Sequence, residues 1–268
     1  MCLCPVTVVH TMPEDEPVEG MTSLGEAIYL LRWYGGRHQV EVYDVISYRL
    51  QRSLTVPHAR VCSDMTSCEH LLCLYISNPH AECIYRLDLE GNAQQWPVND
   101  SPTSLSVNAD HNLIVTCHVV GKIKEFSPRG ELVRDVILPG DVINPRHAIQ
   151  LTSGQFIVSH GEDYDPVRRV CKISSDGRHI VHSHGGQRSS GTGQYGRPWH
   201  LAVDDNEFVF VVDAVNRRVT LLSPTLEYVR QVVSRDQLKW LPCRLGLQRG
   251  RLYVTDMSAS GRVVVFSV

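Results

Sequence analysis

Five side chains suited to binding chemistry follow prolines that recur along the chain: Arg146, His147, Trp199, His200 and Arg244. A guanidinium pairs with carboxylates or phosphates, an imidazole binds metals or moves protons, and an indole offers a broad apolar face. If these residues converge, they predict a polar and aromatic binding site. The alternative is that the histidines and the tryptophan pack inside the fold, with their ring N–H groups bonded to backbone.

The prolines themselves show how such a convergence arises, because six of them divide the chain into near-equal lengths: Pro17, Pro57, Pro102, Pro145, Pro198 and Pro242. Successive separations are 40, 45, 43, 53 and 44 residues, and the 26 residues after the last proline complete one more period with the first 17. A period of this length is typical of solenoids, propellers and arrays. A last unit divided between the two chain ends predicts a closed ring.

Short β-rich runs separated by polar turns fill each period. In the fifth unit these runs cover 207–213, 219–223 and 228–233. Such spacing is typical of all-β folds, and a repeat that is itself a four-stranded sheet selects the propeller. The last unit stops one strand short after Val263–Phe266, and the β-branched run Val6–Val9 can supply the missing strand.

We therefore predict an all-β, six-bladed β-propeller of four-stranded antiparallel blades, a single domain over 1–268 closed by an N-terminal strand that completes the last blade. The approximate blade bounds are 17–56, 57–101, 102–144, 145–197, 198–241 and 242–268 plus 1–10. A proline suits the start of an inner strand, where no ladder N–H is required. The five residues above are therefore expected around the central opening. Glu19, Ala59 and Ser104 are expected at the corresponding position of the other blades.

A second set of residues is basic and lies just before the third run of several units: Arg37, Lys122, Arg168, Arg169, Arg217, Arg218 and Arg262. Repeated blade geometry would place these cations on one rim. Clustered Lys and Arg neutralise phosphates, so the rim predicts RNA binding as an alternative function. The net charge of −3 and the scarcity of aromatic residues near the rim count against it.

The run 191–204, GTGQYGRPWHLAVD, followed by Asp213-Ala-Val-Asn216 and two arginines, resembles an NHL repeat. That resemblance implies a propeller similar to the C-terminal propeller of tripartite-motif proteins. In such proteins the propeller selects a partner. The resemblance therefore implies that this chain is the substrate-recognition part of a larger ubiquitin-ligase-like protein. RNA-binding propellers of the same family use a basic face.

Metal-dependent propeller enzymes form a third class of function. Peptidylglycine-amidating lyases resemble this fold and hold zinc with three histidines, each directly after a proline that begins an inner strand. Here only Pro57-His58 matches, since the other two histidines are displaced by one residue. Lactonase-type propellers need several carboxylates at the opening, where Glu19 is the one acid expected. We therefore predict a protein that is not an enzyme and holds no metal or cofactor.

Composition also predicts the cellular location of the protein and the class of its partner. The nine cysteines are an odd number, several lie in apolar runs, and no Cys-x-x-Cys pair exists. Cysteines in apolar runs typically pack as small, buried, hydrophobic side chains. Reduced thiols of this kind predict a cytoplasmic location. No apolar stretch approaches 18 residues, so no membrane partner is expected. The predicted partner is a protein or peptide, with RNA as the alternative and DNA not expected. The loop 162–165, with three carboxylates, is predicted to be solvated.

Overall fold

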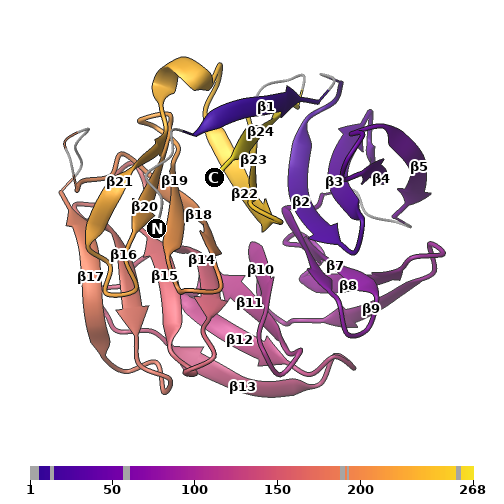
Figure 1. The fold of residues 1–268 in the computed structure, drawn as a ribbon. Coiled ribbons are helices and arrows are strands. Elements are labelled where there is room, and N and C mark those ends of the chain that lie inside the picture. Colours follow the sequence, from indigo (N-terminus) through magenta and orange to yellow (C-terminus); the bar gives the residue numbers. More distant parts are fainter. Residues whose placement is uncertain (1–5, 13–14, 57–60, 188–190, 192, 258–260) are drawn as a thin grey trace.

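The computed structural model describes residues 6–12, 15–56, 61–187, 191, 193–257 and 261–268. Its strands form six four-stranded antiparallel sheets arranged as blades around a centre (Figure 1). The structure therefore confirms the predicted fold class, a six-bladed β-propeller.

Each blade contains four strands that are consecutive in the chain, except in the sixth blade. Blades one to three contain β2 (Val18–Leu24), β3 (Ala27–Tyr34), β4 (Arg37–Asp44) and β5 (Leu50–Thr55); β6 (Asp64–Cys68), β7 (Cys73–Asn78), β8 (Cys83–Asp88) and β9 (Ala93–Pro97); and β10 (Ser104–Val107), β11 (Leu113–Cys117), β12 (Lys122–Phe126) and β13 (Leu132–Ile137). Blades four to six contain β14 (Pro145–Gln150), β15 (Phe156–His160), β16 (Arg168–Ile173) and β17 (Ile180–Gly186); β18 (Pro198–Val203), β19 (Val209–Asp213), β20 (Arg218–Leu222) and β21 (Tyr228–Val233); and β22 (Pro242–Gln248), β23 (Arg251–Asp256), β24 (Val263–Ser267) and β1 (Thr7–Thr11). A short 3₁₀ helix, η1 (Arg235–Gln237), lies between β21 and β22.

The ring closes in the sixth blade, where β1 from the start of the chain pairs with β24 from its end (Figure 1). This pairing confirms the predicted closure. A buried arginine strengthens the junction with the first blade: Arg32 Nε lies 2.5 Å from Glu41 Oε2. Its Nη1 donates hydrogen bonds to the carbonyl oxygens of Glu16 and Gly261, the latter just before β24.

The direction of the strands defines two faces of the ring. The inner strands β2, β6, β10, β14, β18 and β22 all begin on the same face, which we call the mouth face. Because neighbouring strands are antiparallel, the turn between the second and third strands also lies there, as does the connection from a fourth strand to the next blade. The other two turns of blades one to five, and the turn between β22 and β23 in blade six, lie on the opposite face.

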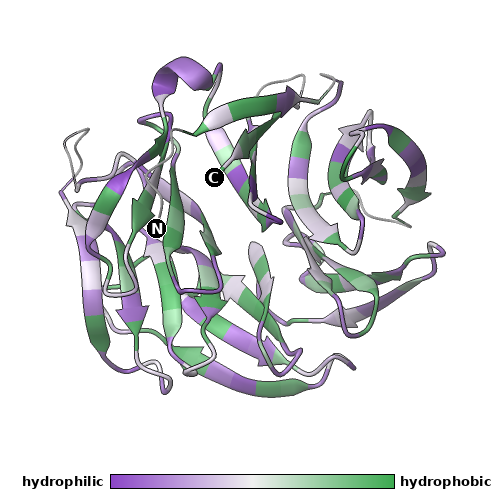
Figure 2. Cartoon of the chain, in the orientation of Figure 1, coloured by the Kyte–Doolittle hydropathy of each residue, from purple (hydrophilic) through white to green (hydrophobic). Residues whose placement is uncertain are grey.

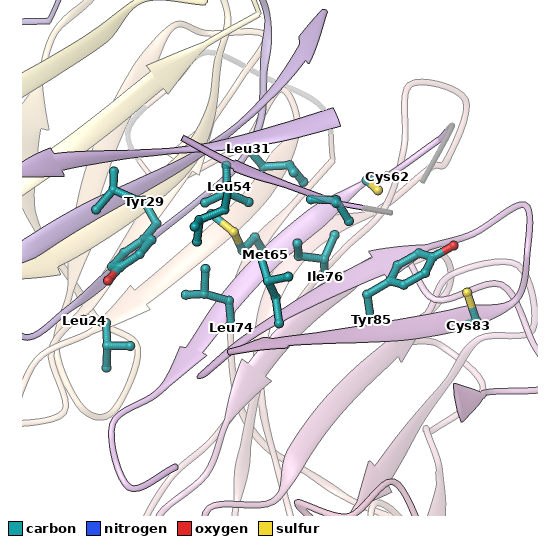
Figure 3. Packing of buried hydrophobic residues seen from close by; sticks show 14 residues of the cluster. Leu24, Tyr29, Leu31, Leu54, Cys62, Met65, Leu74, Ile76, Cys83 and Tyr85 are labelled. Atoms are coloured by element: carbon teal, nitrogen blue, oxygen red, sulfur yellow. The ribbon is translucent and has the colours of Figure 1, made fainter. Parts of the chain in front are cut away.

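The core consists of apolar side chains packed between neighbouring blades. Middle strands such as β11 are apolar and buried along their whole length, whereas outer strands such as β13 are mostly exposed and include charged residues (Figure 2). Between blades one and two, Leu31, Met65 and Ile76 belong to one buried cluster (Figure 3). A Cβ at Gly20 would lie 2.7 Å from the backbone nitrogen of Met65, so glycine permits the close approach of these two inner strands.

Cysteines contribute to this core as small apolar side chains. Those in the described part of the chain are free and buried: Cys62, Cys68, Cys73, Cys83, Cys117, Cys171 and Cys243. Within the same residues, no helix has the length and apolar character needed to cross a membrane.

Candidate functional site

Four buried polar side chains from different inner strands meet at the centre of the ring: Asp64, His147, His200 and Arg244. We call them the central cluster. Their exposed fractions range from 0% for Asp64 to 7% for His200 and Arg244. They come from β6, β14, β18 and β22, close to the start of each strand.

Asp64 is the acceptor that joins three blades. Its Oδ2 accepts hydrogen bonds from Ser104 Oγ, at 2.8 Å, and from the backbone N–H of Leu105, at 2.9 Å. Its Oδ1 lies 3.0 Å from Arg244 Nε, an ion pair with the sixth blade. Arg244 also donates to the carbonyl oxygens of Ser63 and Cys243. The buried charges are therefore compensated by each other and by backbone groups.

The two histidines stack on each other, with ring centroids 3.9 Å apart and an angle of 21° between the planes. Nδ1 of His147 accepts the N–H of Leu201, and Nδ1 of His200 accepts the N–H of Leu245, each at 3.3 Å. Burial lowers the pKa of His147 to about 4 and lowers the pKa of His200 well below its usual value. Both imidazoles are therefore neutral near pH 7, with the proton on Nε2 because Nδ1 accepts.

Three members of the central cluster have the composition of a metal site. Ligand atoms of Asp64, His147 and His200 lie within 4.8 Å of one another. Coordination through Nε2 would move each imidazole proton to Nδ1, where a backbone N–H already donates. Oδ2 of Asp64 also accepts two hydrogen bonds, and its Oδ1 forms the ion pair with Arg244. This arrangement suits a hydrogen-bonded junction between blades better than metal coordination.

The predicted mouth residues separate into two layers. His147, His200 and Arg244 lie in the buried central cluster, and the histidine rings are bonded to backbone, which is the packed arrangement considered above. Arg146 and Trp199 are half-buried and lie one residue nearer the mouth face. The predicted convergence of the three blades therefore occurs, but three of the five residues are almost fully buried.

The sequence prediction missed Asp64. The inner strand of the second blade begins at Asp64, so the prediction that it starts directly after Pro57 was wrong. Pro57, His58 and Ala59 lie outside the described residues. Extra residues before β6 displace the register in this blade. Counting back across the short turn from the apolar run that begins at Cys73 would have aligned Asp64 with His147 and His200.

Above the central cluster, two guanidinium groups lie against the indole of Trp199. The Cζ atoms of Arg146 and Arg197 are 5.1 and 5.2 Å from the ring centroid, within the range of a cation–π interaction. Arg146 forms an ion pair with Glu162, and Arg197 forms one with Asp163. These contacts fix the orientation of the indole at the mouth.

Both of those carboxylates belong to the loop between β15 and β16, which is held by several further contacts. Arg168, buried at the start of β16, donates to the backbone carbonyls of Glu162 and Asp163. Asn144 Nδ2 donates to Asp165 Oδ2 at 2.9 Å. The carboxylates of the predicted solvated loop are half-buried and also take part in these contacts. Tyr164, between them, is 99% exposed.

Two cavities lie on either side of the central cluster. The one on the mouth face, which we call the mouth pocket, has a volume of about 300 Å³ and is lined by Pro17, Val18, Glu19, Trp199, Cys243, Arg244, Asp256 and Met257. Burial raises the pKa of Glu19, and Arg244 partly opposes that effect. The other cavity, about 340 Å³, lies along the inner strands and reaches His147 and His200.

The predicted basic rim lies on the mouth face, since third strands begin there. Most of its cations already have partners. Lys122 Nζ is 2.9 Å from Asp100 Oδ2, and Arg169 Nη2 is 2.9 Å from Asp141 Oδ2. Arg218 Nε is similarly 3.0 Å from an Asp213 carboxylate oxygen. Arg168 is 1% exposed, so it is not part of the surface as predicted.

The remaining rim residues are Arg37, Arg217 and Arg262. Arg37 is exposed at the start of β4. Arg217 donates to the carbonyl oxygen of Lys239 at 3.2 Å, and Arg262, half-buried just before β24, also has an interaction partner. The rim is therefore a mixed-charge surface in which few cations are available to a phosphate.

No family model matches the sequence, and no curated protein matches it either. Solved structures do resemble it. A PQQ-bound aldose sugar dehydrogenase from Streptomyces coelicolor has a TM-score of 0.73 at 12% identity, covering 98% of this chain and 97% of that one. Virginiamycin B lyase from Staphylococcus aureus has a TM-score of 0.68 at 8% identity, over 98% and 99%.

A third similar structure, the Cps50 (Swd1) β-propeller domain from Myceliophteria thermophila, has a TM-score of 0.67 at 12% identity, covering 98% of this chain and 100% of that one. At these identities the likeness shows the fold alone. The protein therefore belongs to the structural class of six-bladed β-propellers, which includes both enzymes and binding proteins.

Proposed function

We propose that this protein is a non-enzymatic recognition module that binds another protein through its mouth face. The main support is the distribution of exposed large apolar side chains among the connections between strands. On the mouth face these are Val61, Val119, Val120, Tyr164, Trp240 and Met257. On the opposite face, the corresponding turns expose Ile46 and Leu72. Gathered apolar and aromatic residues are typical of protein interfaces.

Tyr164 has the features of an interface anchor. Its side chain is fully exposed, yet ion pairs and backbone contacts fix the loop on both sides of it. A rigidly presented tyrosine loses little conformational entropy on binding and offers a large amphipathic surface. Trp240, 54% exposed in the connection before β22, offers a second aromatic surface on the same face.

The non-enzymatic part of the proposal is supported by the state of the central cluster. Its histidines are neutral and use Nδ1 to accept backbone N–H groups, and its carboxylate is ion-paired. Neither imidazole has a free lone pair for a metal or a proton transfer unless it changes tautomer. RNA ranks below protein as the partner because Lys122, Arg169 and Arg218 are paired with aspartates and a fourth rim cation is buried.

From the NHL resemblance we propose that this recognition module acts within a larger protein. In a larger ubiquitin-ligase-like protein, a propeller of this kind would select the substrate. The mouth face would then be the surface that contacts that substrate, and the other parts of the protein would supply the transfer chemistry.

Affinity capture with paired variants tests the proposal. Tagged wild-type protein, the double variant Tyr164→Ala/Trp240→Ala and the opposite-face variant Ile46→Ala are incubated with nuclease-treated cell lysate. We expect the proteins enriched by the wild type to be enriched equally by Ile46→Ala and at least about a hundredfold less by the double variant, since two aromatic anchors at about 2 kcal/mol each total about 4 kcal/mol. Equal thermal denaturation of the three proteins serves as the folding control.

Two results would contradict the proposed function. In one, the double variant retains every partner. In the other, nuclease treatment removes all of them, which would point to RNA as the bridging ligand.

A further inference from the structure

We propose that the mouth pocket accepts a basic side chain, an arginine, of the protein partner. This inference rests on the proposed protein-binding role and specifies which chemical group the partner contributes. The pocket lies on the mouth face beside Trp199, between the inner strands of the first, fifth and sixth blades. A partner that covers the mouth face therefore has to place some group over it.

The charges that line the pocket favour a cation. Two carboxylates, Glu19 and Asp256, and one guanidinium, Arg244, line it. That guanidinium already forms an ion pair with Asp64, from the layer below. Asp256 has an interaction partner as well, so Glu19 is the wall carboxylate that attracts a positive group and repels a carboxylate or phosphate.

Glu19 is the carboxylate whose charge is least compensated. Among the residues that the structure describes, it forms no hydrogen bond, and Arg244 is the cation that opposes the rise in its pKa. Its pKa is raised because burial disfavours the charged form. An incoming guanidinium would supply the hydrogen bonds that this carboxylate lacks, and a charge-assisted bond in a half-buried site is stronger than one in water.

The shape and the apolar wall of the pocket suit one long side chain. Its volume is about 300 Å³, and Val18, Trp199 and Met257 form apolar parts of the wall. The methylenes of arginine can pack against such a surface while the charged head reaches the carboxylate. A planar guanidinium also matches a carboxylate with two parallel hydrogen bonds, which an ammonium cannot do.

Binding of short blocked peptides tests the inference directly. The probes are N-acetyl-Gly-Arg-Gly-amide and the same peptide with citrulline, which keeps the shape of arginine but carries no charge. Binding is followed by the change in tryptophan fluorescence, to which Trp199 in the pocket wall contributes, and by NMR titration. We expect saturable binding of the arginine peptide and about tenfold weaker binding of the citrulline peptide, because a charge-assisted hydrogen bond contributes about 1.5 kcal/mol or more.

Two variants complete the design. Glu19→Gln removes the charge in the pocket, and Glu131→Gln makes the same change at an exposed residue on the opposite face. We expect Glu19→Gln to weaken binding of the arginine peptide about tenfold and Glu131→Gln to leave it unchanged. The inference is overturned if citrulline binds as well as arginine, if Glu19→Gln binds like the wild type, or if the arginine peptide does not bind.

These outcomes are separable from those of the proposed function. Tyr164 and Trp240 do not line the mouth pocket. One outcome is that Tyr164→Ala/Trp240→Ala loses its partners while the arginine peptide fails to bind. That outcome would reject arginine binding in the mouth pocket and support protein binding through the mouth face. Retention of every partner by that double variant would reject the mouth-face proposal itself.

Discussion

Asp64 and Arg244 form an ion pair at the centre of the ring, with Oδ1 and Nε 3.0 Å apart. They come from the second and sixth blades, and both are buried. Between those blades in the ring lies the first blade, whose inner strand carries Gly20, and a Cβ there would lie 3.1 Å from the carbonyl carbon of Asp64. The pair therefore connects blades on both sides of the junction where the ring closes.

Replacing Asp64 with Asn should destabilise the fold strongly. Asn keeps the shape but leaves the guanidinium of Arg244 buried without its counter-charge, and removing one partner of a buried pair costs about 3–5 kcal/mol. Urea denaturation followed by fluorescence would measure the loss. Asp205→Asn, at an exposed turn, is the control and should change the free energy of unfolding by less than about 0.5 kcal/mol. Equal stability of the two variants would show that the ion pair is unimportant.

Acid should destabilise the protein through its buried histidines. Burial lowers the pKa values of His147 and His160 to about 4, whereas an unfolded histidine titrates near about 6.5. The unfolded state therefore takes up protons first, so this stability is fully present above about pH 6.5 and is lost as the pH falls toward about 4. Each histidine should cost about 2 kcal/mol between about pH 7 and about pH 5.

Urea denaturation at several pH values measures this dependence. The variant His160→Gln should show a shallower decrease of the free energy of unfolding with falling pH, whereas His179→Gln, at an exposed residue, should keep the wild-type slope. A slope that is identical in all three proteins would exclude His160 as a source of the acid sensitivity.

Zinc should not bind at the central cluster. The imidazole lone pairs at Nδ1 accept backbone N–H groups, and coordination would require both histidines to change tautomer and Asp64 to leave Arg244. A ligand that binds only the folded state raises the melting temperature. We therefore expect equimolar zinc to leave Tm unchanged. A rise in Tm that disappears in a His200→Gln variant would contradict this prediction and reopen the enzyme alternative.

RNA binding by the rim should be weak. Because Lys122, Arg169 and Arg218 are paired with aspartates, few counterions would be released from a bound strand. Fluorescence anisotropy with an unstructured RNA should give a Kd no tighter than about 10⁻⁴ M at about 0.15 M salt. Micromolar binding that weakens steeply with salt and is lost in Arg37→Ala/Arg217→Ala would instead support the RNA alternative.

The sequence by itself determined the architecture of this protein. The proline period, the alternating runs and the division of the last unit between the two ends predict six blades and their closure by Val6–Val9, because these features are local and repeat with the blade. The same period brings together Arg146, Trp199 and the two central histidines, since equal positions in a repeat occupy equal positions in the ring.

The tertiary structure decided which of these residues are exposed and unpaired, so that a partner can contact them. Asp64 could not be found from the period because extra residues before β6 shift its register. The burial of His147, His200 and Arg244 depends on hydrogen bonds to other blades, and the neutralisation of the rim depends on aspartates from other strands and loops. Local sequence patterns specify strands and turns, but pairing between buried or charged groups far apart in the chain arises only when the ring brings them into contact.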